Sequence, residues 1–120
     1  MTSLEKAQEI VKILDRKKAR DIRLLEIRNL STLGDYFIIA TGGSNTQVKA
    51  LSDEVDLDMH KQFGVYPSRI EGQQTAQWIL MDFGDVMVHI FQEEARSFYA
   101  LERLWTDAPQ VDISDLLIKD

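Results

Sequence analysis

Two aspartates, Asp56 and Asp58, stand in the one spacing of this sequence that suggests a metal-dependent active site. They follow a Gly42-Gly43-Ser44 turn, and the combination matches the nucleotidyltransferase pattern, in which the turn holds a phosphate and the two carboxylates bind Mg²⁺. Both aspartates, however, fall inside a helical pattern of apolar residues that runs from Val48 to Phe63. On a helix, residues i and i+2 point about 200° apart and cannot share one metal ion. The sequence therefore favours an acidic, solvated helix face over an enzyme.

The other side chains that could perform catalysis or bind a metal are few and scattered. His60 and His89 are the only histidines, and they belong to different predicted elements. Ser44 and Ser97 have no evident histidine and aspartate relay to activate them. Cysteine is absent, which excludes disulfides, thiolate metal sites and cysteine nucleophiles. We therefore predict a protein with no enzymatic activity, no metal and no cofactor.

The charge distribution predicts a protein partner rather than a nucleic acid. The chain has 120 residues and a net charge of −6, with eight Lys/Arg against five Asp/Glu in residues 1–28 and six against fifteen in residues 29–120. An acidic body repels phosphate backbones, so dedicated nucleic-acid binding is not expected and a basic protein fits better. The basic segment from Arg16 to Arg28 could contact RNA, but complementing the C-terminus of a helix explains most of it.

The chain shows neither a membrane-spanning segment nor a signal peptide. No apolar run approaches the roughly 20 residues that a transmembrane helix needs. The N-terminal residues 1–6 lead directly into mixed charge instead of an apolar stretch. A cytoplasmic protein with no membrane partner is the simplest interpretation.

Hydrophobic periodicity and turn residues predict a single α/β (mixed α+β) domain with one mixed sheet of about five strands and flanking helices. The predicted elements are helix 3–18, strand 21–28, strand 36–41, a helix from Ser44 to Phe63, strand 67–72, strands 78–83 and 86–91, and helix 93–105. Their order is α-β-β-α-β-β-β-α. Residues 1–106 form the predicted domain, and residues 107–120 form an acidic tail that is either loosely docked or disordered.

Capping residues and apolar faces support the three predicted helices. Thr2 with Glu5 and Ser44 with Gln47 fit capping boxes. Gly64 suits the end of the second helix, because a left-handed residue commonly follows the last turn. The residues predicted to face the core are Val48, Leu51, Val55, Met59 and Phe63 on the second helix and Phe98, Leu101 and Trp105 on the third.

The two strands joined by Gly84-Asp85 carry the most informative pattern in the sequence. A two-residue turn with Gly first favours a type II′ hairpin, in which Phe83 pairs with Val86. One face of the hairpin is then wholly apolar and suits a core: Ile79, Met81, Phe83, Val86, Val88 and Ile90. The other face mixes large apolar and single polar side chains, as a protein-binding surface does: Trp78, Leu80, Asp82, Met87, His89 and Phe91. A covering helix is an equally good explanation for this second face, and one end could be covered while the other is exposed.

Residues 5–106 resemble the RsfS/Iojap family of ribosomal silencing factors. The residues that carry the resemblance are Asp35 to Gly42 followed by Ser44, then Glu71-Gly72, Trp78, Asp82, Gly84 to Phe91, Arg96, Tyr99, Leu101-Glu102 and Leu104-Trp105. The family's fold looks like a nucleotidyltransferase core without the active site. Gln47 departs from the pattern, since many members have a basic residue there.

The resemblance implies a function in translation. It implies binding to the large ribosomal subunit through the fourteenth large-subunit protein, which would block association with the small subunit and lower translation when nutrients are short. A role in large-subunit biogenesis is also implied, and a homodimer of the free protein is compatible with the sequence. We expect the partner-binding residues to be Trp78, Leu80, Asp82, Asp85, His89 and Phe91. The alternatives are a nucleotidyltransferase-like enzyme or nucleotide binder, and an RNA-binding module.

Overall fold

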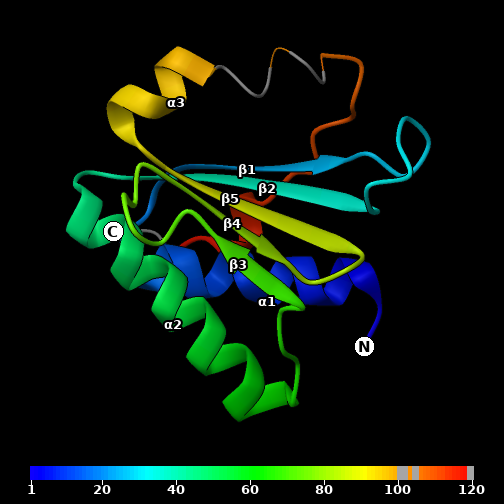
Figure 1. Cartoon of the computed structure of the whole chain (residues 1–120). Coiled ribbons are helices and arrows are strands. Elements are labelled where there is room, and N and C mark those ends of the chain that lie inside the picture. The colour runs from blue at the N-terminus through cyan, green and yellow to red at the C-terminus, as the bar shows by residue number, and fades with distance from the viewer. Residues whose placement is uncertain (100–102, 104–105, 119–120) are drawn as a thin grey trace.

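A computed structural model describes residues 1–99, 103 and 106–118 of the chain. Its elements follow the predicted order, which confirms a single α/β domain (Figure 1). They are helix α1 (Ser3–Arg16), strands β1 (Arg20–Glu26) and β2 (Tyr36–Gly42), helix α2 (Asn45–Phe63), strands β3 (Arg69–Glu71), β4 (Trp78–Asp82) and β5 (Val86–Gln92), helix α3 (Glu93–Tyr99) and a short 3₁₀ helix η1 (Ser114–Leu116).

The five strands form one mixed sheet in the order β1-β2-β5-β4-β3. Strands β2 and β5 are parallel, and the other three neighbouring pairs are antiparallel. Strand β2 is buried along its whole length, as its continuous apolar run predicted. The two long central strands therefore provide the rigid middle of the sheet, and β4 and β3 extend it outward.

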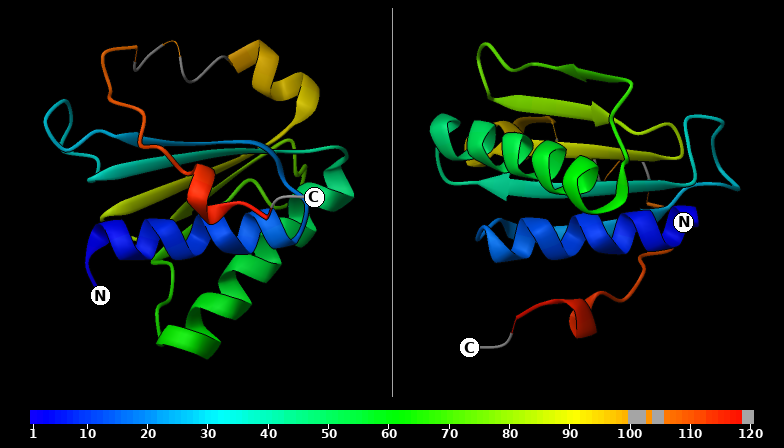
Figure 2. Two further views of the ribbon diagram at one scale, coloured as in Figure 1. Left: turned by 180° about the vertical axis from the view of Figure 1, so that it is seen from behind. Right: turned by 90° about the horizontal axis from the view of Figure 1, so that it is seen from below.

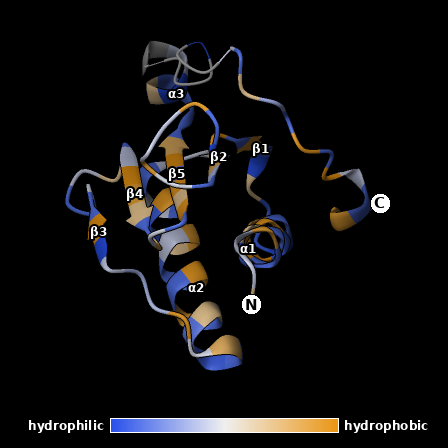
Figure 3. Ribbon diagram, turned by 90° about the vertical axis from the view of Figure 1, so that its right-hand side faces the viewer, coloured by the Kyte–Doolittle hydropathy of each residue, from blue (hydrophilic) through white to orange (hydrophobic). Residues whose placement is uncertain are grey.

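The helices divide between the two faces of the sheet. Helices α1 and α2 lie side by side on one face, and α3 lies over the other (Figures 1 and 2). The larger core cluster fills the space between the sheet and α1 and α2, and includes Ile10, Leu51, Ile79 and Val88. Figure 3 shows hydrophobic residues gathered along β4 and β5. The second face of the sheet has a smaller apolar cluster under α3 and the segment that follows it.

The helix ends follow local sequence signals with two exceptions. Thr2 and Glu5 form the predicted capping box, and Gly64 adopts the left-handed conformation with φ +66°. Ser44 caps α2, but the Gln47 side chain accepts a hydrogen bond from the N–H of Gly43, 2.5 Å away, instead of completing a capping box with Ser44. The prediction that Phe63 faces the core is wrong, because it is 39% exposed and the last turn of α2 extends beyond the sheet (Figure 1).

The β4–β5 hairpin has the predicted register. Trp78 pairs with Phe91 and Asp82 with Met87, and the N–H of Phe83 donates to the carbonyl of Val86 at 3.0 Å. Gly84 has φ +88° whereas Asp85 is not in the left-handed region, as a type II′ turn requires. All six residues of the predicted core face are buried. The hairpin thus turns an alternating sequence into one core face and one outer face.

Residues 106–118 cross the edge of β1 and pack on the domain. The carbonyl of Pro109 accepts a hydrogen bond from the N–H of Glu26 at 2.9 Å, and the N–H of Val111 donates to the carbonyl of Leu24 at 2.8 Å. Val111 and Leu116 pack against the larger core cluster. Of the two predicted arrangements for this segment the structure shows a docked one, and the division of the chain after residue 106 stays a prediction.

The predicted extension of the third helix to residue 105, with Leu101 and Trp105 facing inward, lies outside the described residues, as does the side chain of Phe98. Among the helices of the described residues, none has the length and apolar character that crossing a membrane requires.

Candidate partner-binding site

The outer half of the second sheet face is exposed, while the inner half is covered. On β4, Ile79 and Met81 are buried in the core, whereas Trp78, Leu80 and Asp82 point to the other side and are half-buried. We call the outward side chains of β4 and its neighbour β3 the outer-strand surface; it comprises Trp78, Leu80, Asp82, Arg69 and Glu71. Period-two alternation on β4 therefore presents three of the six predicted site residues at one surface.

Trp78 is held in one orientation by residues of the neighbouring strand β5. Its indole stacks on the ring of Phe91, with centroids 5.0 Å apart and an interplanar angle of 25°. Its indole N–H donates to Nδ1 of His89 at 3.1 Å. An aromatic side chain fixed by both stacking and a hydrogen bond loses little conformational entropy when a partner binds. The Trp78 side chain is consequently held in one conformation at the outer-strand surface.

His89 and Phe91, which the sequence placed in the same site, lie beneath the surface. Phe91 is fully buried and His89 is 5% exposed, with the Phe37 ring 4.8 Å from the imidazole. The structure shows that these two side chains position Trp78 and do not present their own atoms to a partner in this conformation. The hairpin pattern predicts on which face of the sheet His89 and Phe91 lie. It does not predict how deeply they are buried, because burial depends on which other segments cover the strand.

Burial also sets the protonation state of His89. It lowers the pKa of His89 from 6.5 to about 4, so the imidazole is neutral at physiological pH. Since Nδ1 accepts from Trp78, the proton lies on Nε2, which is buried with no hydrogen-bond partner among the described residues. A protonated His89 could no longer accept the indole hydrogen bond, so neutrality of this ring and the orientation of Trp78 are linked.

We expect His89 to make the protein less stable as the pH falls from about 6.5 to about 4. In that range the unfolded chain binds a proton at His89 and the native protein does not, so the free energy of unfolding decreases by roughly 3 kcal/mol at most. Urea denaturation of the wild type and of His89→Leu at several pH values isolates this contribution from the carboxylates common to both. The difference in stability should shift in favour of the variant on acidification, and parallel pH profiles would contradict the assignment.

The two aspartates near the turn have different surroundings. Asp82 accepts a hydrogen bond from the N–H of Gly84 at 2.8 Å and pairs with Arg69 at 3.3 Å on the outer-strand surface. Asp85 instead pairs with Lys6 of α1, with Nζ and Oδ1 2.7 Å apart. Because α1 covers the opposite face of the sheet, the structure does not bring Asp85 together with Asp82.

Arg69 and Glu71 are the members of the surface that sequence reasoning missed. They pair with Asp82 and Leu80 across the β3–β4 ladder, and their own side chains form an ion pair at 3.2 Å. The alternation of Arg69, Ile70 and Glu71 was a usable signal, since Ile70 packs against the core and its neighbours must point away. The register between β3 and β4 could not be predicted from the sequence, because residues 72–77 connect these strands and are too many for a two-residue hairpin turn that would fix the pairing.

The two aspartates of the nucleotidyltransferase pattern lie on a helix, and one of them has a structural role. Asp56 and Asp58 lie within α2, as the periodicity predicted, and Asp58 pairs with Arg16 of α1 at 3.1 Å. The structure holds no group of three or more His, Cys, Asp or Glu side chains suited to a metal ion within the residues that it describes. The rigid aromatic and charged surface on β4 is typical of a protein that acts by binding.

Comparisons with known proteins show to which family this binding protein is similar. The model of the family "Ribosomal silencing factor during starvation" matches residues 1–120. A ribosomal silencing factor of Halalkalibacterium halodurans is 38% identical over 117 residues, which cover 98% of this chain and 99% of that protein. A crystal structure of a Chromobacterium violaceum protein superposes with a TM-score of 0.84 at 37% identity and covers 88% of each chain. A mouse protein named for mitochondrial assembly of the ribosomal large subunit is 31% identical over 81% of this chain and 43% of its own length.

The chain belongs to the family of ribosomal silencing factors, also known through its Iojap members. Members of this family are ribosome-binding factors and not enzymes, so the nucleotidyltransferase alternative is set aside. Family membership implies that the protein binds the large ribosomal subunit.

Proposed function

We propose that this protein silences translation by binding the fourteenth large-subunit ribosomal protein and so blocking the approach of the small subunit. The observation that supports this proposal is the half-exposed Trp78, stacked on Phe91 and hydrogen-bonded to His89 beside Leu80 and Asp82. An aromatic anchor with an apolar neighbour and a charged rim is the usual composition of a binding hot spot. The outer-strand surface is therefore the docking site in this proposal.

The chemistry of the surface favours a basic partner that presents an apolar patch. Leu80 and the Trp78 ring offer apolar contact, and Asp82 and Glu71 offer acceptors for cationic groups. These side chains project from paired strands, so binding requires little backbone rearrangement and a small ordering cost. A ribosomal protein, held rigid by its own assembly, suits such a preformed surface.

In this proposal the protein acts in the cytoplasm by steric exclusion of the small subunit. Its action lowers translation when nutrients are short. A role in large-subunit biogenesis extends the proposal, and the name of the mouse relative supports it. A homodimer of the free protein would use the same half-apolar surface. In that case the dimer and the ribosome-bound form exclude one another, so dimerisation lowers the concentration of monomer that can bind the ribosome.

Trp78→Ala is expected to weaken binding to isolated large subunits far more than it weakens the fold. Removal of an interfacial aromatic anchor typically costs about 2 kcal/mol or more of binding free energy. Trp78 is only half-buried, and its partners Phe91 and His89 remain in the sheet without it. Co-sedimentation with large subunits, read beside thermal melting, measures the two effects separately.

Tyr66→Ala is the matched control for this variant. Tyr66 is an aromatic residue that is 66% exposed in the segment between α2 and β3, and it stacks on His60 of α2. It should bind large subunits as the wild type does. Equal losses in the two variants, or a loss for Trp78→Ala that only follows unfolding, would count against the proposed docking site.

A further inference from the structure

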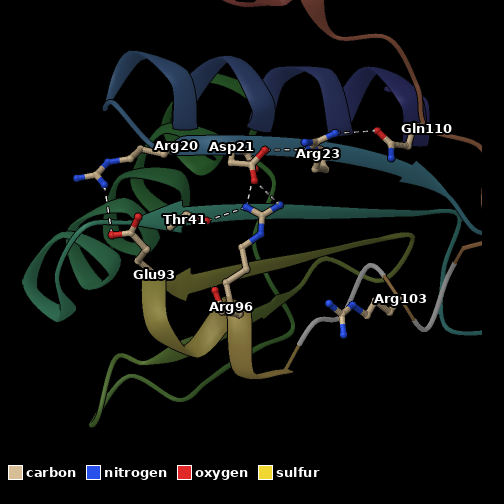
Figure 4. A pocket seen from close by; sticks show the side chains of 9 residues that line it. Arg20, Asp21, Arg23, Thr41, Glu93, Arg96, Arg103 and Gln110 are labelled. Atoms are coloured by element: carbon tan, nitrogen blue, oxygen red, sulfur yellow. Dashed lines mark hydrogen bonds and ion pairs between the residues drawn. The ribbon is translucent and has the colours of Figure 1, made fainter.

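A pocket rich in arginine lies on the same side of the sheet as the outer-strand surface. Its volume is about 700 Å³, and residues of β1, β2, α3 and the segment after α3 line it (Figure 4). The lining residues are Arg20, Asp21, Arg23, Thr41, Glu93, Arg96, Ser97, Arg103 and Gln110. Four guanidinium groups face two carboxylates, which leaves two positive charges in a chain whose net charge is −6.

An irregularity in β1 builds one wall of the pocket. Residues three apart on a regular strand point to opposite faces, yet Arg20 and Arg23 both line this pocket. The register of β1 against β2 shifts between these two residues, and Asp21 between them has φ +47°. The shift turns both arginines toward the same space, as a bulge does when it redirects a side chain.

Arg96 holds the pocket together from α3. Its side chain is buried, and Nη1 donates to the carbonyl of Asp21 at 2.5 Å and to Oγ1 of Thr41 at 2.7 Å. Its Nη2 lies 3.4 Å from a carboxylate oxygen of Asp21. These bonds join α3 to β1 and β2 and fix the spacing of the surrounding arginines.

The arginines at the rim are weakly engaged. Arg20 and Glu93 are 3.6 Å apart, and each side chain is more than half exposed. Arg103 is exposed and has no ion-pair partner among the residues that the structure describes. Figure 4 shows Arg20 and Arg103 at opposite ends of the pocket. An exposed ion pair contributes little, so an incoming anion can replace Glu93 at small cost.

We propose that this pocket binds backbone phosphates of RNA. Arginine is the side chain that best matches the geometry of a phosphate, through two parallel hydrogen bonds. Every described lining residue is polar, so no aromatic ring is available there to stack on a base, and recognition of the backbone is favoured over recognition of a nucleotide. The remaining acidic surface is screened over about 8 Å in physiological salt, so the local charge of the pocket decides whether an anion binds there.

The assignment of RNA as the source of the phosphate rests on the proposed function. The outer-strand surface and the arginine pocket lie on the same side of the sheet, and residues of α3, which covers that side, line the pocket. A large subunit that presents a protein to the first surface can therefore present ribosomal RNA to the second. The pocket would add affinity and fix the orientation of the bound protein.

Arg20→Gln combined with Arg103→Gln tests the proposal in the full-length protein. The probe is a short, fluorescein-labelled single-stranded RNA of mixed sequence, followed by fluorescence anisotropy over a series of salt concentrations. The double variant should bind about tenfold more weakly and lower the salt slope by about 1.4, roughly 0.7 for each phosphate contact removed from a single strand. Arg16→Gln, an exposed arginine of α1 on the opposite side, should bind as the wild type.

Three outcomes would overturn either the proposal or the assignment of RNA as the source of the bound phosphate. Equal RNA binding by the wild type and the double variant overturns it, as does an equal loss in Arg16→Gln. Binding of inorganic pyrophosphate that needs Arg20 and Arg103, without RNA binding, overturns the assignment to RNA in favour of a free phosphate compound. Asp82→Lys separates this inference from the docking proposal, because it should retain RNA binding even if large-subunit binding is lost.

Discussion

Val88→Asp is expected to leave the protein unfolded. Val88 is fully buried in the middle of β5, paired with Ile38 of β2 and Met81 of β4, and its side chain faces the core cluster under α1 and α2. Even a protonated acid costs about 2–7 kcal/mol when it is buried without a hydrogen-bond partner. The whole stability of a domain of this size is about 5–15 kcal/mol, so this change removes most of it.

Circular dichroism and thermal melting measure this effect, and Val88→Thr is its matched control. Threonine has nearly the shape of valine, so it keeps the packing and replaces one methyl with a hydroxyl, which should cost about 1–3 kcal/mol. This control should fold with a lower melting temperature. A Val88→Asp protein that melts near the wild type would show that α1 and α2 do not bury this face of β5.

Asp82→Lys is expected to abolish large-subunit binding while the protein stays folded. The substitution places a cation beside Arg69 and reverses the charge that a basic partner would meet. Like charges brought together at an interface cost several kcal/mol, so affinity should fall about a hundredfold or more. The fold loses the hydrogen bond from the N–H of Gly84, about 1 kcal/mol, and an ion pair whose arginine is exposed.

Co-sedimentation with large subunits and a subunit-association assay measure the loss. Asp82→Asn retains an acceptor for Gly84 and removes only the charge, so its affinity should be intermediate. Asp53→Lys makes the same exchange on the exposed side of α2 and should bind normally. If Asp82→Lys unfolds the protein, or binds as well as Asp53→Lys does, then Asp82 does not meet a basic group on the partner.

Much of the fold was readable from local patterns. The Gly84-Asp85 turn and the alternation on both sides of it predicted the register that pairs Trp78 with Phe91. The continuous apolar run of β2 predicted a buried central strand, and Gly64 predicted the end of α2. These features depend on residues close in sequence, where turn geometry and side-chain period leave few alternatives.

The candidate site was only partly readable. Trp78, Leu80 and Asp82 reach the outer-strand surface as predicted from the second face of the hairpin, although their role in binding stays a proposal. His89 and Phe91 share that face and are buried, and Asp85 is drawn to Lys6 on the opposite side. Each difference arises from a contact with a residue distant in the chain.

The sequence by itself determined the order of the elements, the core face of the hairpin and the side of the sheet on which its second face lies. It also indicated a binding protein, since Asp56 and Asp58 lie on a helix. Only the tertiary structure decided how that second face is divided. Helix α3 and the segment around Ala108 return over β2 and β5, cover Phe91 and leave β4 open. The same return encloses the arginine pocket. Coverage of this kind depends on where distant segments cross the sheet, and no spacing within one strand or helix encodes it.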